Sequence, residues 1–170
     1  MRIRRSLLTV FFAVAACLLL ASVFGRTLGI VVARVEGRAM GPTIENQDRL
    51  IVNAWSYTRT SPQRGDIIML RYPVDPSKSF VKRVVAVGGD VVRIEDGRVF
   101  VNDVAADEPY VAPAARSHES SAAQTIPAGS YYVLGDRRNN SSDSRHWGLV
   151  PEANIVGRVA WRWWPSPARF

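Results

Sequence analysis

Short apolar runs recur along the chain after residue 27, and they are rich in the β-branched and aliphatic residues that strands favour. No window in this part of the sequence keeps the 3.6-residue periodicity of an amphipathic helix. We therefore predict a mainly β fold, with strands at residues 28–35, 49–53, 66–72, 80–87, 91–94, 98–101, 130–134 and 155–163.

The clearest local signal lies between the fifth and sixth of these runs. They are separated by Glu95-Asp96-Gly97, in which Gly97 tolerates the positive φ angle that a tight hairpin turn needs. Residues 103–129 are rich in Ala, Ser, Pro and His, which indicates a loop-rich insertion or a small subdomain. We expect a β core from residues 27–90 and 130–165, interrupted by an inserted small subdomain at residues 91–129.

The N-terminus has a different pattern. Residues 6–25 carry no charge, and about 20 such residues span a bilayer as a helix. Three arginines precede this run, so the positive-inside bias predicts a cytoplasmic N-terminus and export of everything after Arg26. A cleaved signal peptide is the alternative, but the run is long for one and no small-x-small site precedes Arg26. We expect residues 1–26 to form a cytoplasmic tip and a single transmembrane anchor.

The net charge of +7 does not indicate nucleic-acid binding. Residues 1–34 hold five Arg and no acidic residue, so most of the excess lies at the N-terminus rather than on a folded surface. One cysteine excludes an internal disulfide, and two sequence-distant histidines disfavour the common zinc patterns. We expect no metal, no cofactor and no nucleic-acid partner.

The last predicted strand carries three tryptophans, Trp161, Trp163 and Trp164. Alternation along a strand places Trp161 and Trp163 on one face. Packing in the core is one interpretation of these rings. The other is contact with the lipid–water interface, which indole rings favour.

Three segments carry candidate chemistry: residues 37–43 (Gly-Arg-Ala-Met-Gly-Pro-Thr), the strand around Lys82, and the polar stretch 135–145. Burial of a lysine in an apolar strand lowers its pKa, so that its amine can act as a base. Taken alone, the pattern favours a surface position for Lys82 at a strand edge. Residues 135–145 alone are compatible with a hydrogen-bonded turn.

Together, and in this order after an apolar N-terminal run, the segments resemble bacterial type I signal peptidases of the single-span form. Arg64-Gly65-Asp66-Ile67 and Gly148-Leu149-Val150-Pro151 also resemble that family. The resemblance implies a β-rich core with a small inserted β-subdomain, on the outer face of the bacterial plasma membrane. It implies a serine endopeptidase with a Ser–Lys dyad that cleaves signal peptides from exported preproteins after small-x-small sites. Preprotein signal peptides and membrane lipid are the implied partners.

The resemblance also implies roles for individual residues. Position 39 is that of the nucleophile, Lys82 is the general base, and Ser141 orients the lysine amine. The implied supporting residues are Asp136, Arg138, Asp143 and Arg145, the last two as an ion pair. Substrate is expected between the strand ending at residue 37 and residues 80–82, in contact with Val35, Gly37, Met40, Phe80 and Val81. The backbone N–H of residue 39 is the implied oxyanion donor, and Gly37 offers no hydroxyl as a second one.

The sequence departs from the family at the nucleophile, because position 39 holds alanine, Ala39. A methyl group cannot attack a carbonyl, so this chain is expected to bind signal peptides without cleaving them. One explanation is a deliberate Ser→Ala change. The other is a natural non-catalytic homologue that binds signal peptides or assists assembly. Retention of Lys82 and of the Ser141 segment favours the first. Smaller departures are Arg137, where the family usually has Asn, and Gly88, where it usually has Pro.

Overall fold

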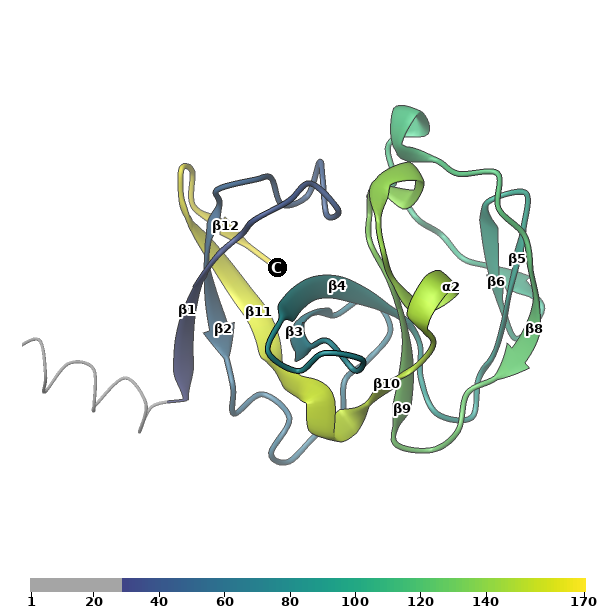
Figure 1. Cartoon of the computed structure of the whole chain (residues 1–170), viewed down its shortest axis with the longest axis horizontal. Coiled ribbons are helices and arrows are strands. Elements are labelled where there is room, and N and C mark those ends of the chain that lie inside the picture. Colours follow the sequence, from purple (N-terminus) through teal and green to yellow (C-terminus); the bar gives the residue numbers. More distant parts are fainter. Residues whose placement is uncertain (1–28) are drawn as a thin grey trace, which may run out of the picture.

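The computed structural model describes residues 29–170, and every predicted strand in that range forms (Figure 1). The mainly β class is thereby confirmed. The predicted anchor at residues 1–26 lies outside the described residues. Between residues 29 and 170, no helix is both long and apolar enough to cross a membrane.

The larger sheet has eight strands and curls around an apolar interior (Figure 1). Its strand order is β1-β2-β11-β3-β4-β9-β10, and β12 pairs with β11. All neighbouring pairs are antiparallel. The strands are β1 (Ile30–Arg34), β2 (Arg49–Asn53), β3 (Ile67–Arg71), β4 (Ser79–Ala86), β9 (Ser130–Leu134), β10 (Val150–Pro151), β11 (Ile155–Trp164) and β12 (Ala168–Arg169).

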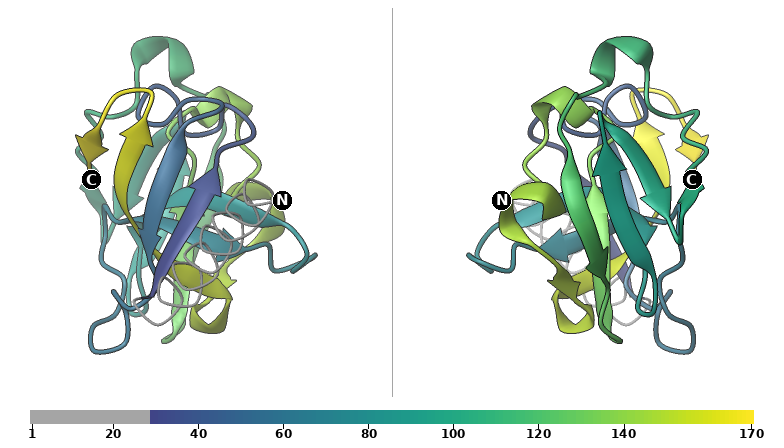
Figure 2. Two further views of the ribbon diagram at one scale, coloured as in Figure 1. Left: turned by 90° about the vertical axis from the view of Figure 1, so that its left-hand side faces the viewer. Right: turned by 90° about the vertical axis from the view of Figure 1, so that its right-hand side faces the viewer.

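The smaller sheet has four strands in the order β7-β6-β5-β8, all formed between β4 and β9 in the sequence. It comprises β5 (Val91–Glu95), β6 (Arg98–Val101), β7 (Val104–Ala105) and β8 (Ser121–Thr125). The predicted hairpin is confirmed, because β5 and β6 pair through Glu95 and Arg98, with positive φ at Asp96 (45°) and Gly97 (75°). Figure 2 shows this sheet at the opposite end of the molecule from β1 and β2.

Helices are short and lie at the connections. Within residues 29–170 they comprise one α-helical turn, α2 (Ser144–Trp147), and three 3₁₀ helices, η1 (Pro113–Ala115), η2 (Arg138–Asn140) and η3 (Glu152–Asn154). The α2 turn begins after Asp143, whose carboxylate accepts a hydrogen bond from the N–H of Arg145 as an N-cap does.

Apolar side chains from both sheets join them at β4 and β9. Val85 and Leu134 of the larger sheet pack with Val92 and Val99 of the smaller one in a single buried cluster. Two further clusters fill the curled sheet, one of them around Met40, Leu50 and Val159. Because β4 and β9 contact both sheets, the residues at their ends lie where the main parts of the fold meet.

The tryptophans of β11 lie on the surface. The exposed fractions of Trp161, Trp163 and Trp164 are 48%, 39% and 56%. Packing in the core was therefore the wrong interpretation. The pairing of β11 with β2 has a register shift between Val159 and Trp161, so that Trp161 is exposed although Val159, two residues earlier, is fully buried.

Candidate active site

The loop after β1 presents Ala39 next to the curled sheet. The N–H of Val35 donates to the carbonyl of Asp48 at 2.8 Å, and the N–H of Ile44 donates to the carbonyl of Met40 at 3.0 Å. The side chain of Met40 is buried in the apolar interior of the larger sheet, which holds the loop in place. Ala39 therefore occupies a defined place at the end of β1.

Lys82 lies on β4, and only 3% of its surface is exposed. Burial disfavours the charged ammonium and lowers the pKa of Lys82 to about 8. Its Nζ lies 3.0 Å from the Oγ of Ser141. Lys82 and Ala39 line the same groove. Lys82 is thus a buried amine that is largely neutral at mildly alkaline pH. The interpretation that Lys82 lies at a strand edge facing solvent is therefore wrong.

The segment after β9 approaches the loop of Ala39 closely at Gly135. A Cβ at this position would lie 2.2 Å from the Oγ of Ser141 and 2.5 Å from the carbonyl oxygen of Ala39. The N–H of Arg137 donates to that same carbonyl at 3.0 Å. Glycine at 135 therefore lets Ser141 and the Ala39 loop meet on either side of the backbone.

Asp143 and Arg145 form the predicted ion pair beneath Ser141. Arg145 donates through Nε and Nη2 at 2.8 and 2.9 Å, and Asp143 also accepts from the N–H of Gly135 at 3.0 Å. Burial by itself raises the pKa of Asp143, but the hydrogen bonds and the charge of Arg145 outweigh it and hold that pKa below its usual value. The pair is a charged support for residues 135–145.

Asp136 and Arg138 each pair with a residue that the sequence did not suggest. The carboxylate of Asp136 is fully buried and accepts from Arg83 at 2.9 and 2.6 Å and from the hydroxyl of Thr43 at 2.6 Å. Arg138 donates to Glu108 and, at 2.9 Å, to the carbonyl of Gly135. Arg83 directly follows Lys82 in the sequence. This adjacency was the signal from which a supporting role of Arg83 could have been predicted.

A groove of about 140 Å³ runs along Ala39 and Lys82. The side chains predicted to contact substrate all line it: Val35, Gly37, Met40, Phe80 and Val81. Two strand edges lie at this groove. Among the described residues, β1 pairs only with β2, and β4 pairs with β9 only from Arg83 onward. An extended peptide can therefore add backbone hydrogen bonds here.

Comparison with known proteins shows which family the chain belongs to. The model of the family described as "Signal peptidase, peptidase S26" matches residues 3–164. The chain belongs to this family of signal peptidases. The resemblance read from the motifs is thereby confirmed.

Named members of the signal peptidase family align with most of the chain. A probable signal peptidase I-2 of Synechocystis is 40% identical over 139 residues, which are 78% of this chain and 62% of that protein. The thylakoidal processing peptidase 1 of Arabidopsis thaliana chloroplasts is 38% identical over 77% of this chain and 41% of its own length. The chain thus spans less than two thirds of the length of these relatives.

A solved structure supports the fold of the signal peptidase family directly. The crystal structure of a signal peptidase I from Enterococcus faecalis superposes with a TM-score of 0.54 at 30% sequence identity. The superposition covers 59% of this chain and 97% of the other.

The backbone at Gly37 bears on the chemistry of a signal peptidase. The N–H of Gly37 donates to the side-chain oxygen of Asn46 at 2.9 Å. This N–H group is therefore already hydrogen-bonded within the loop and is not free to donate to a substrate oxygen. Next to Ala39, Gly37 therefore offers no hydroxyl, and its N–H is already hydrogen-bonded to Asn46.

Proposed function

We propose that this chain holds the signal-peptide segment of an exported preprotein in the groove between β1 and residues 79–82. As written, the chain binds this segment without cleaving it. The observation that carries the proposal is the methyl group of Ala39 in a groove that also contains the buried Lys82 amine, 3.0 Å from Ser141. A general base and a polar partner for it are present where the nucleophilic oxygen is missing.

A serine at position 39 supplies the missing atom. Neutral Lys82 then takes the hydroxyl proton while Oγ attacks the scissile carbonyl carbon. The N–H of residue 39 donates to the resulting oxyanion, and the Lys82 ammonium gives its proton to the departing amine. Lys82 next takes a proton from water while the water oxygen attacks the acyl-serine carbon. The C–Oγ bond then breaks, the Lys82 ammonium returns its proton to the serine Oγ, and the acid product leaves as its carboxylate. Ser141 accepts a hydrogen bond from the ammonium and positions it.

The size of the groove supports small side chains next to the cleaved bond. Its volume of about 140 Å³ lies well below the 300–1,000 Å³ that is typical of drug-sized ligand sites. Small-x-small sites, of the Ala-x-Ala type, fit such a groove. Backbone pairing at the two strand edges supplies affinity that does not depend on the other side chains.

Location and organisation form part of the same proposal. Residues 1–26 anchor the chain in the bacterial plasma membrane in a single pass with the N-terminus in the cytoplasm, so that the groove faces outward. Residues 27–90 and 130–165 form the catalytic core, and 91–129 form the inserted subdomain. Membrane lipid is then a partner of the exposed tryptophans of β11.

A second function rests on the same alanine. If the natural gene encodes alanine at position 39, the chain is a non-catalytic homologue that binds signal peptides or assists assembly. Gly37 favours this candidate, because it too lacks a hydroxyl and its N–H is already engaged by Asn46.

The test compares the chain with its Ala39→Ser variant on a preprotein that carries an Ala-x-Ala site, in detergent, with product masses measured. We expect only the serine variant to cut, at least about a thousandfold faster than the parent. Its rate should rise with pH through about 8, since Lys82 must be neutral. Lys82→Met in the serine background is the matched control and should abolish cleavage.

The outcomes separate the two functions. If neither protein cuts but both bind the signal peptide, the chain is a binding protein. If the serine variant cuts equally well when it also carries Lys82→Met, the dyad assignment is wrong. If neither protein binds a signal peptide, the proposal fails.

A further inference from the structure

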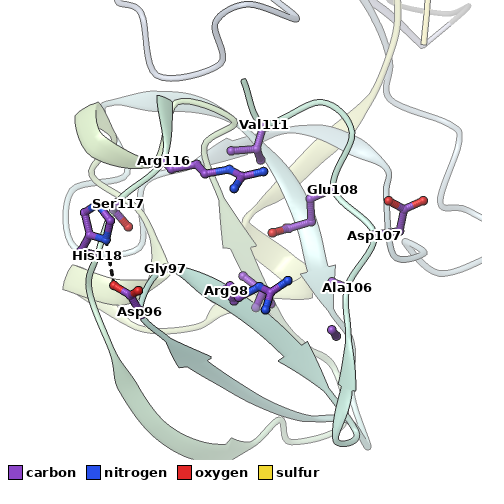
Figure 3. A pocket seen from close by; sticks show the side chains of 12 residues that line it. Asp96, Gly97, Arg98, Ala106, Asp107, Glu108, Val111, Arg116, Ser117 and His118 are labelled. Carbon is purple, nitrogen blue, oxygen red and sulfur yellow. Dashed lines mark hydrogen bonds and ion pairs between the residues drawn. The ribbon is translucent and has the colours of Figure 1, made fainter. Parts of the chain in front are cut away.

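A second cavity lies beside the smaller sheet, and it shares no lining residue with the groove of Lys82. Its volume is about 410 Å³. Figure 3 shows it enclosed by the β5–β6 turn, residues 105–108 and residues 111–118. The proposed function makes no use of this cavity.

The walls of the cavity are tied together by backbone contacts. The N–H of Gly97 donates to the carbonyl of Glu119 at 2.8 Å, and a Cβ on Gly97 would lie 1.8 Å from the carbonyl oxygen of Ser117. The N–H of Ala106 donates to the carbonyl of Val99 at 2.9 Å. The hollow is thus pre-formed, as most ligand sites are.

Two cations face this hollow without a partner. Figure 3 shows the guanidinium groups of Arg98 and Arg116 directed into the cavity from different walls. Within residues 29–170, neither side chain makes an ion pair or a side-chain hydrogen bond. Both are exposed, so a ligand arriving from solvent can reach them.

The acidic groups at the cavity are already engaged or turned away. Glu108 accepts hydrogen bonds from Arg138 and, at 3.1 Å, from the hydroxyl of Tyr110. Asp96 lies 2.8 Å from the Nδ1 of His118, and Asp107 turns outward (Figure 3). Among residues 29–170, the two guanidinium groups are thus the charged groups that point into the cavity and lack a side-chain partner.

We propose that this cavity binds a ligand with one carboxylate group on a small apolar body. The planar guanidinium fork pairs with a carboxylate through two parallel hydrogen bonds. The buried side chains of Val99 and Val111 line the cavity and offer contact to the apolar part. The carboxylate comes either from a free organic acid or from an acidic side chain of a polypeptide.

The test uses the full chain in detergent and isothermal titration calorimetry. The probes are 3-methylbutanoate for the free acid and acetyl-Leu-Glu-Leu-amide for the polypeptide. Their matched controls are 3-methylbutanamide and acetyl-Leu-Gln-Leu-amide. We expect at least one acid to bind about tenfold more tightly than its amide. Arg98→Gln and Arg116→Gln should each raise its Kd about tenfold.

Arg59→Gln is the control variant, because it removes the same charge from an exposed arginine outside the cavity. It should change the Kd by less than about twofold. Binding of the free acid identifies a small-molecule site, and binding of the peptide alone identifies a polypeptide site.

Three results would overturn the proposal: no binding of either acid up to about 10 mM, equal binding of acid and amide, or an equal effect of Arg59→Gln. Both arginines are exposed and, among residues 29–170, form no ion pair or side-chain hydrogen bond, so we expect both variants to fold. Unchanged thermal unfolding midpoints verify this. Failure here leaves the proposed function untouched, since the two sites share no residue.

Discussion

Replacement of Lys82 by methionine should make the folded chain more stable at neutral pH. The pKa of Lys82 falls from 10.5 to about 8 because burial disfavours its charge. A difference of about 2.5 pH units corresponds to about 3.4 kcal/mol of penalty when both states are protonated. Loss of the hydrogen bond to Ser141 offsets about 1 kcal/mol. Since methionine fills a similar volume, we expect Lys82→Met to raise the free energy of unfolding by about 2 kcal/mol at pH 7.

The pH dependence gives this prediction its sign. Between about pH 8 and 10.5 the unfolded chain holds a proton on Lys82 that the folded chain has released. The stability of the parent therefore rises with pH through this window, while the methionine side chain of the variant does not titrate. The advantage of the variant should be full below about pH 8. Above about 10.5 it should reverse to a loss of about 1 kcal/mol, the value of the missing hydrogen bond.

Urea unfolding followed by tryptophan fluorescence measures this difference, with parent and variant compared at each pH so that other titrations cancel. The matched control is Lys78→Met, because the side chain of Lys78 is 64% exposed. That change should shift stability by no more than about 0.5 kcal/mol. A Lys82→Met variant that is less stable than the parent at pH 7, or a difference independent of pH, refutes the assignment of Lys82 as a buried, destabilising amine.

Two further predictions concern the surroundings of that amine and the surface of β11. Gly135→Ala should destabilise the fold by about 1–3 kcal/mol, because its Cβ would lie 2.2 Å from the Oγ of Ser141. In the Ala39→Ser background it should also lower kcat. Denaturation and preprotein cleavage test this, and unchanged values of both contradict the close approach. In a chain without residues 1–26, so that the proposed anchor does not itself bind lipid, Trp161→Ser combined with Trp164→Ser should weaken flotation with anionic liposomes and leave the unfolding midpoint nearly unchanged, because both rings are exposed. Unchanged flotation means that these rings do not contact lipid.

The strands and the segment of Lys82 could be predicted from the sequence because their signals are local. Each strand is a short apolar run, and the turn at Gly97 is set by the φ preference of one residue. The lysine alone favoured a solvent-facing strand edge, and only its place among the three segments indicated the burial that the structure has, at 3% exposure. Local composition suffices where a feature depends only on neighbouring residues.

Features that depend on sheet order could not be predicted in this way. Asp136 pairs with Arg83 because β9 lies beside β4, which no sequence pattern indicated. Arg138 pairs with Glu108 because the inserted residues fold back over the core. The surface position of Trp161 depends on a register shift after Val159, to which simple alternation is blind.

The position of the smaller sheet has an evolutionary consequence. Its segment leaves the core after β4 and returns at β9, and these two strands are neighbours. The connections are tied by the N–H of Gly89 to the carbonyl of Ile126 at 2.8 Å and by the N–H of Ile126 to the carbonyl of Asp90 at 2.8 Å. Insertions and deletions between Asp90 and Ile126, beyond these two hydrogen bonds, can therefore accumulate without moving Lys82. The constraints that remain on such drift include the apolar cluster that joins the two sheets, and the carboxylates of Glu108 and Glu119, which must still reach the arginines of the core.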